Sequence, residues 1–135
     1  MRAIIGYGNE LRGEDAFGID VIKELQKFEI KDTRLISAFG LTPEVVLELL
    51  DTDEVIFVDA AFSKEGDYAL ACSINKESTH LSHSILPHTI ISILENVYKK
   101  HPTYQIYSML TNSFENIDDA KKYRENIAKV ASFLC

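Results

Sequence analysis

The segment Glu54-Val55-Ile56-Phe57-Val58-Asp59 places four consecutive apolar residues between two acidic ones. An uninterrupted apolar run of this kind is typical of a strand that is buried on both faces of a parallel sheet. Asp59 therefore falls at the end of the most hydrophobic strand. A second apolar run, Ala3-Ile4-Ile5, leads into Gly6-Tyr7-Gly8-Asn9, which indicates another strand followed by a glycine-containing turn.

The remaining chain alternates between helix-like and strand-like patterns. The spacing of apolar residues predicts helices over about 16–28, 84–98 and 118–133. Thr42 and Pro43 suit the N-cap and first position of a further helix that runs to about Leu50. Strands are predicted over 34–38, 68–74 and 105–110. This alternation indicates a three-layer α/β/α domain with a mostly parallel sheet, and the length fits a single domain over residues 1–135.

Composition narrows the classes of function. The formal net charge is −7, so the chain lacks the positive charge that is typical of nucleic-acid binders. No apolar run approaches the roughly 20 residues of a membrane span, and the N-terminus has no signal-peptide layout. Cys72 and Cys135 are far apart and form no CxxC motif, which favours reduced thiols. We therefore expect a cytoplasmic protein without membrane insertion.

Two acidic residues follow predicted strands. Asp15 lies in the loop after the first strand, and Asp59 ends the hydrophobic strand. Ligands of open α/β sheets bind beyond the carboxyl ends of strands, where such carboxylates can meet around a cation. The segment 78–83, with His80 and His83, follows a further strand. Two carboxylates and an imidazole suit zinc, nickel, manganese or iron(II), with positions left for water or a substrate carbonyl.

Each of these residues also has a structural interpretation. Asp15 could favour the positive end of the first helix, and Asp59 could cap the next turn. His80 or His83 could be an ordinary surface histidine of a loop. Glu14 is expected to be a solvated neighbour of the site. The spacing alone makes the metal site a hypothesis.

Other catalytic machinery is absent from the sequence. The pair Gly6-x-Gly8 has Leu11 where a dinucleotide-binding fingerprint needs a third small residue, and no Walker lysine is present. There is no GxSxG elbow. Gly8-Asn9 therefore favours a tight turn where backbone approaches a ligand or partner. A hydrolase with this sequence would depend on a metal and water.

The residues nonetheless resemble a known family, the hydrogenase maturation endopeptidases. Its N-terminal signature is similar to Ile5-Gly6-Tyr7-Gly8-Asn9-Glu10-Leu11-Arg12-Gly13-Glu14-Asp15-Ala16-Phe17-Gly18-Ile19-Asp20-Val21-Ile22. Val55-Ile56-Phe57-Val58-Asp59-Ala60 resembles the family's apolar strand, and His83-Ser84-Ile85-Leu86-Pro87 resembles its histidine loop. Ser113-Phe114-Glu115 resembles a segment of some branches. The resemblance covers essentially the whole chain, and it departs at Ala16-Phe17, where many relatives have smaller residues.

This resemblance implies a twisted mixed sheet between helices, and an activity. Members remove a short C-terminal extension from the large-subunit precursor of NiFe hydrogenase after nickel insertion. Their metal-binding and catalytic residues correspond to Asp15, Asp59 and His83, with His80 as the alternative histidine. Nickel would be supplied by the substrate, and other divalent metals could substitute.

The resemblance also indicates a substrate-binding side. Gly40 matches a glycine of the family's substrate-side loop, and Gly8 and Asn9 are expected to contact the substrate at the glycine turn. Two other functions stay open. A metal-dependent hydrolase of small molecules would bind metal tightly on its own, whereas a non-enzymatic metal-binding α/β module would have no catalytic role. A receiver-like module is disfavoured because the strand 105–110 contains no lysine.

Overall fold

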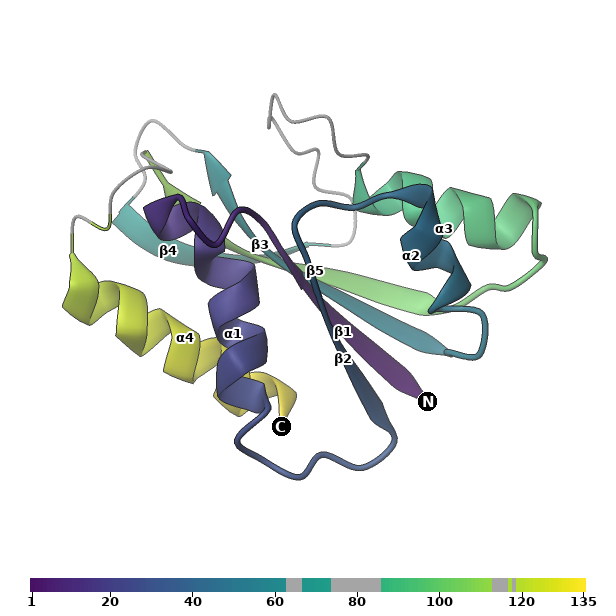
Figure 1. Ribbon diagram of the computed structural model, residues 1–135, viewed down its shortest axis with the longest axis horizontal. Coiled ribbons are helices and arrows are strands. Elements are labelled where there is room, and N and C mark those ends of the chain that lie inside the picture. Colours follow the sequence, from purple (N-terminus) through teal and green to yellow (C-terminus); the bar gives the residue numbers. More distant parts are fainter. Residues whose placement is uncertain (63–66, 74–85, 113–116, 118) are drawn as a thin grey trace.

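A twisted sheet forms the centre of the molecule (Figure 1). The computed structural model describes residues 1–62, 67–73, 86–112, 117 and 119–135. The strands are β1 (Arg2–Tyr7), β2 (Thr33–Ala38), β3 (Glu54–Phe62), β4 (Asp67–Ser73) and β5 (Thr103–Thr111). Their order is β2-β1-β3-β5-β4; β4 is antiparallel to β5 and the other pairings are parallel. The predicted mostly parallel, mixed sheet is confirmed.

Helices cover both faces of this sheet (Figure 1). The helices α1 (Phe17–Leu25) and α4 (Ala120–Leu134) lie on one face. On the other face are α2 (Pro43–Leu47) and α3 (Pro87–Asn96). A single 3-10 turn, η1 (Gly13–Ala16), connects the loop after β1 to α1. The arrangement confirms the three-layer α/β/α architecture.

Strand β3 contributes to both hydrophobic cores. Val55 and Phe57 pack with α2 and α3, whereas Ile56 and Val58 pack with α1 and α4. Alternate residues of a strand point to opposite faces, so the continuous apolar run is buried on both sides. By the same alternation Asp59 shares the face of Phe57. This strand therefore directs an acid toward the α2–α3 side of the sheet.

The boundaries of several elements differ from the predicted ones. Helix α3 begins at Pro87 rather than near residue 84, because a residue before proline avoids the helical region and Leu86 is extended, with ψ 154°. Helix α2 begins at Pro43 as predicted but ends at Leu47, and no side-chain hydrogen bond from Thr42 caps it. Helix α1 likewise ends before the predicted residue 28.

Strand β3 does not end at Asp59, contrary to the prediction. It continues to Phe62 because its pairing with β5 continues to Phe62 and Thr111. Its pairing with β1, however, ends at Gly6 and Val58. Asp59 therefore lies just past the β1–β3 ladder, where a side chain can meet residues of the loop that follows β1.

Two glycines let α1 lie directly on the strands. A Cβ atom added to Gly18 would be 2.2 Å from the Val58 carbonyl oxygen and 2.8 Å from the Tyr7 nitrogen. A Cβ atom added to Gly6 would be 2.0 Å from the Gly18 carbonyl oxygen. Real Cβ atoms do not approach backbone this closely. The glycines of the N-terminal motif therefore set how close η1 and α1 come to the carboxyl ends of β1 and β3.

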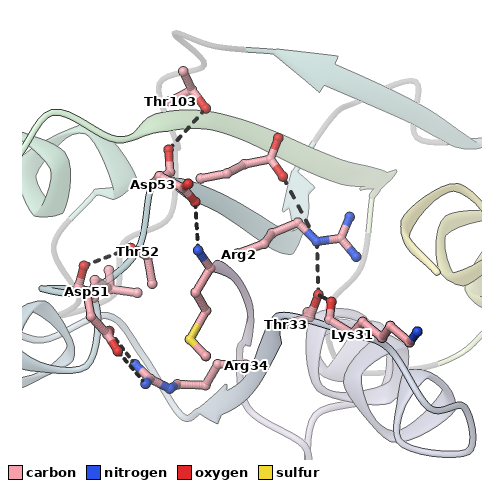
Figure 2. Close-up of polar contacts among 11 residues, drawn as sticks. Arg2, Lys31, Thr33, Arg34, Asp51, Thr52, Asp53 and Thr103 are labelled. Carbon is pink, nitrogen blue, oxygen red and sulfur yellow. Dashed lines mark hydrogen bonds and ion pairs between the residues drawn. The ribbon is translucent and has the colours of Figure 1, made fainter.

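Polar contacts tie the opposite, amino-terminal ends of the strands together (Figure 2). Arg34 donates two hydrogen bonds to Asp51, each of 2.9 Å. The N-terminal amine donates to Asp53 Oδ1 at 3.1 Å, and the Thr103 N–H donates to the Asp53 carbonyl oxygen at 3.0 Å. These contacts join β1, β2, β3 and β5 at the end of the sheet away from Asp59.

Both cysteines are unpaired, as expected from the sequence. Cys72 is an exposed residue of β4, and Cys135 is exposed at the end of α4. Among the described residues, no helix combines the length and the apolar character that crossing a membrane requires.

Candidate functional site

Asp59 is a buried carboxylate held by two hydroxyl groups. Its side chain is 4% exposed. The Tyr7 hydroxyl, at the end of β1, donates to Asp59 Oδ2 at 2.5 Å. The Ser108 hydroxyl donates to Asp59 Oδ1 from β5, where Ser108 is the register partner of Asp59. Both carboxylate oxygens therefore have a donor, one from each neighbouring strand.

The Tyr7 hydroxyl lies in the field of two acids. Burial raises the pKa of Tyr7 well above its usual value, and the charge of Asp59, the hydrogen bond to Asp59 and the charge of Asp15 raise it further. Tyr7 is therefore an O–H donor throughout the physiological pH range. The two predicted acids act on the same hydroxyl group although they come from different elements.

Asp15 lies in η1, half-buried at the rim of the sheet. The Asn9 N–H donates to Asp15 Oδ2 at 3.1 Å, and the Leu11 N–H donates to Asn9 Oδ1 at 2.9 Å. Gly8 has φ +145°, and a Cβ atom there would be 2.0 Å from the Asp15 carbonyl oxygen and 3.5 Å from Oδ1. Glycine at position 8 therefore lets the backbone carbonyl of Asp15 pack directly against the turn that follows β1.

Glu14 is not the solvated neighbour that the sequence predicted. Its side chain is 1% exposed and accepts hydrogen bonds from Thr111 on β5 and from the Tyr68 hydroxyl on β4. The Tyr68 oxygen in turn accepts a 2.7 Å hydrogen bond from the Asp119 N–H before α4. The prediction was wrong because η1 turns this side chain inward, and Glu14 ties the turn to the far strands.

A small pocket lies beside the glycine turn, at the carboxyl ends of β1 and β2. Its volume is about 180 Å³, and its walls are Gly8, Glu10, Ile19, Ser37, Ala38 and Phe39. The Gly8 N–H donates to the Ala38 carbonyl oxygen at 3.1 Å, which joins the two strands below the pocket. Of the predicted substrate-binding residues, Gly8 lines this pocket, whereas Asn9 and Gly40 each follow a lining residue in the chain.

The histidine candidates fall outside the described part of the chain. His80 and His83 lie in the segment 74–85, and Ser113-Phe114-Glu115 lies in 113–116. Within the ranges that the structure describes, no three His, Cys, Asp or Glu residues are grouped closely enough to hold a metal. The described acids Asp15 and Asp59 are oxygen donors that suit a divalent cation together with further ligands.

Sequence reasoning missed the hydroxyl partners of the acids. Ser108 is a small polar residue within an otherwise largely apolar strand, and that contrast could have indicated a specific contact. Tyr7 stands between two glycines of the motif. Its contact with Asp59 depends on the parallel pairing of β1 with β3, which the sequence does not specify.

The comparison with curated proteins identifies one relative. A provisionally named hydrogenase maturation protease of Methanocaldococcus jannaschii is 31% identical over 109 residues. The match covers 72% of this chain and 63% of the relative, so the matched region spans less than two thirds of that protein. No family model matches the chain.

Solved structures of hydrogenase maturation proteases share the fold. The NiFe hydrogenase maturation protease HycI from Thermococcus kodakarensis has a TM-score of 0.76 at 21% identity, covering 98% of this chain and 88% of that one. The maturating endopeptidase HybD from Escherichia coli has a TM-score of 0.71 at 17% identity, with the same coverages of 98% and 88%. The resemblance first seen in the motifs is confirmed, and the chain has the fold of the NiFe hydrogenase maturation proteases.

Proposed function

We propose that the chain is a cytoplasmic endopeptidase that removes the C-terminal extension of a nickel-loaded NiFe hydrogenase large-subunit precursor. The observation that carries this proposal is the buried Asp59 carboxylate held by the Tyr7 hydroxyl at the carboxyl edge of the sheet, with Asp15 near enough for its charge to raise the pKa of Tyr7. This edge is where open α/β sheets bind ligands. The fold and the curated relative support a maturation protease over other hydrolases.

Asp15 and Asp59 would engage the nickel ion that the precursor already contains. Asp59 has a carboxylate whose orientation is fixed by two hydroxyls, and Asp15 is held at the rim by the Asn9 amide. His83 is the proposed third ligand, with His80 as the alternative. Nickel supplies Lewis acidity for polarising a carbonyl or activating water. The acids of this chain would orient the precursor so that the scissile peptide lies at the site.

The C-terminal extension would approach along the glycine turn. Gly8, Asn9 and Gly40 are the proposed substrate-binding residues, and Gly8 and Phe39 line the pocket of about 180 Å³. Phe39 is 75% exposed, so its ring is accessible to the extension. The pocket has room for one side chain of the extension.

The decisive experiment is the intact mass of the host's large-subunit precursor before and after incubation with the protein. Loss of a discrete C-terminal peptide from nickel-loaded precursor, and no loss from nickel-free precursor, is the expected result. Asp15→Asn and Asp59→Asn keep the shape of the side chains and remove their charge, so both should reduce cleavage steeply. Full activity of both variants would contradict the site assignment.

An unchanged mass with verified nickel-loaded precursor would overturn the proposal. The remaining candidate functions would be a metal-dependent hydrolase of small molecules and a non-enzymatic metal-binding module. Titration of the isolated protein with Ni²⁺ separates these functions from maturation. A small-molecule metallohydrolase should bind the ion tightly by itself, whereas a maturation protease can bind it weakly because the precursor supplies it.

A further inference from the structure

We propose that Tyr7 and Ser108 are positioning residues that fix the orientation of the Asp59 carboxylate for catalysis. This inference rests on the proposed function, because it assigns Asp59 to the reaction. The two hydroxyls belong to β1 and β5, the strands on either side of β3. Each hydroxyl holds a different carboxylate oxygen.

Two donors on two oxygens restrict the carboxylate more than one donor would. A single hydrogen bond leaves the group able to rotate about its Cβ–Cγ bond. With Tyr7 on Oδ2 and Ser108 on Oδ1, rotation breaks both hydrogen bonds at once. The plane of the carboxylate is thereby fixed, together with the directions in which it can meet a metal ion. Outer hydrogen bonds of this kind commonly orient carboxylate ligands.

Both hydroxyls donate to the Asp59 carboxylate inside the fold. Tyr7 is 8% exposed and Ser108 is 1% exposed. Tyr7 packs in the core between the sheet and helices α2 and α3. Any effect of these hydroxyls on cleavage would therefore be transmitted through Asp59. The role of these two hydroxyls therefore differs from that of Asp15 and Asp59, which are proposed to contact the nickel ion of the precursor.

The first test compares two tyrosines. Tyr7→Phe deletes the hydroxyl that holds Asp59, and Tyr123→Phe deletes the hydroxyl of a similarly buried tyrosine, which donates to Asp20 at 2.6 Å between α4 and α1. Loss of an outer-shell hydrogen bond typically costs about 10- to 100-fold in activity. Tyr7→Phe should lower kcat for precursor cleavage by this factor and leave KM unchanged. Tyr123→Phe should leave both constants unchanged.

The second test separates the hydroxyl of Ser108 from its packing. Ser108→Ala deletes the donor, and Ser108→Thr keeps it while adding a methyl group to a fully buried position. Overpacking destabilises a core, so a purely structural role predicts that activity follows the melting temperature of each variant. Positioning predicts instead that kcat falls in Ser108→Ala and is restored in Ser108→Thr, whatever the order of their melting temperatures.

These outcomes separate failure of the inference from failure of the proposed function. Wild-type protein that leaves nickel-loaded precursor intact overturns the proposed function and this inference with it. Wild-type protein that cleaves, while Tyr7→Phe and Ser108→Ala cleave at the wild-type rate, overturns the positioning role alone. An equal kcat loss in Tyr7→Phe and Tyr123→Phe, or activity that follows melting temperature in the Ser108 pair, also overturns it. Precursor affinity, measured by fluorescence anisotropy, should be unchanged in Tyr7→Phe and Ser108→Ala.

Discussion

Glu14 and Asp15 are consecutive residues of one turn, yet their carboxylates have different environments. Glu14 is fully buried on the α1–α4 side and accepts hydrogen bonds from Thr111 and Tyr68. Asp15 is half-buried and accepts a hydrogen bond from the Asn9 N–H, and its charge raises the pKa of Tyr7. One acid therefore anchors the turn to the sheet, and the other stays at the rim where a substrate can arrive.

This division predicts opposite effects for the two acids. Glu14→Ala removes the hydrogen bonds that Thr111 and Tyr68 donate to the carboxylate, and a hydrogen bond to a charged group contributes about 1.5–3 kcal/mol. We expect the free energy of unfolding in urea to fall accordingly. Asp15→Asn should change unfolding little, because the side chain is partly solvated, and should strongly reduce precursor cleavage. Equal destabilisation by the two substitutions would contradict the division.

The close packing of α1 on the strands gives a second prediction. In Gly18→Ala the new methyl group overlaps backbone atoms of Val58 and Tyr7, which cannot move aside as a flexible side chain would. We expect a loss of about 3 kcal/mol or more in the free energy of unfolding. Lys23→Ala places alanine at an exposed position of the same helix and is the control. It removes only a surface ion pair with Glu10, which is worth about 1 kcal/mol or less.

The pH dependence of thermal stability tests the pair of Arg34 and Asp51 at the amino-terminal ends of the strands. The hydrogen bonds and charge of Arg34 lower the pKa of Asp51. Since the folded-state pKa lies below the unfolded one, the pair stabilises the fold above the unfolded pKa of about 4. This contribution is lost as pH falls through the folded-state pKa. Asp51→Asn should therefore lower Tm slightly at pH 7, and the variant and wild type should converge in acid.

Salt provides the control for that comparison. Both partners of the pair are accessible to solvent, so 1 M NaCl, at which the Debye length is about 3 Å, should reduce the Tm difference at pH 7. A difference that persists at high salt and at low pH would show that Asp51 acts through packing rather than charge.

The main elements could be predicted because local chemistry specifies them. The apolar run from Val55 to Val58 predicts a strand that is buried on both faces. Pro43 indicates the start of a helix independently of the tertiary contacts. The ends of elements were less predictable, since they depend on partners. Strand β3 continues past Asp59 only because β5 pairs with it that far.

The site was predictable in part for the same reason. The sequence alone could place Asp15 in the loop after β1 and Asp59 in the buried strand β3, although β3 continues past Asp59. The burial of Glu14 could not be predicted, because its acceptor role depends on Thr111 and Tyr68, which lie far along the chain. The contact of Tyr7 with Asp59 likewise requires knowledge of which strands are neighbours.

Phe39 gives a prediction for substrate binding. It lines the pocket at the carboxyl ends of β1 and β2 and is 75% exposed. Phe133 on α4 is 64% exposed and is not one of the residues that line that pocket. Removing either exposed ring should leave the melting temperature nearly unchanged. If the precursor covers Phe39, then Phe39→Ser should raise KM about tenfold, which corresponds to about 1.4 kcal/mol of binding energy. Phe133→Ser should leave KM unchanged.

The two phenylalanines together distinguish a specific contact from general surface hydrophobicity. A rise in KM for both variants would indicate that exposed aromatic area anywhere on the surface assists precursor association. No rise for either would remove the pocket from the proposed path of the C-terminal extension, while the assignment of Asp15 and Asp59 would stand on its own tests. A rise for Phe39→Ser alone, with kcat unchanged, would place the precursor over the pocket, because binding lost equally from ground and transition states changes KM only.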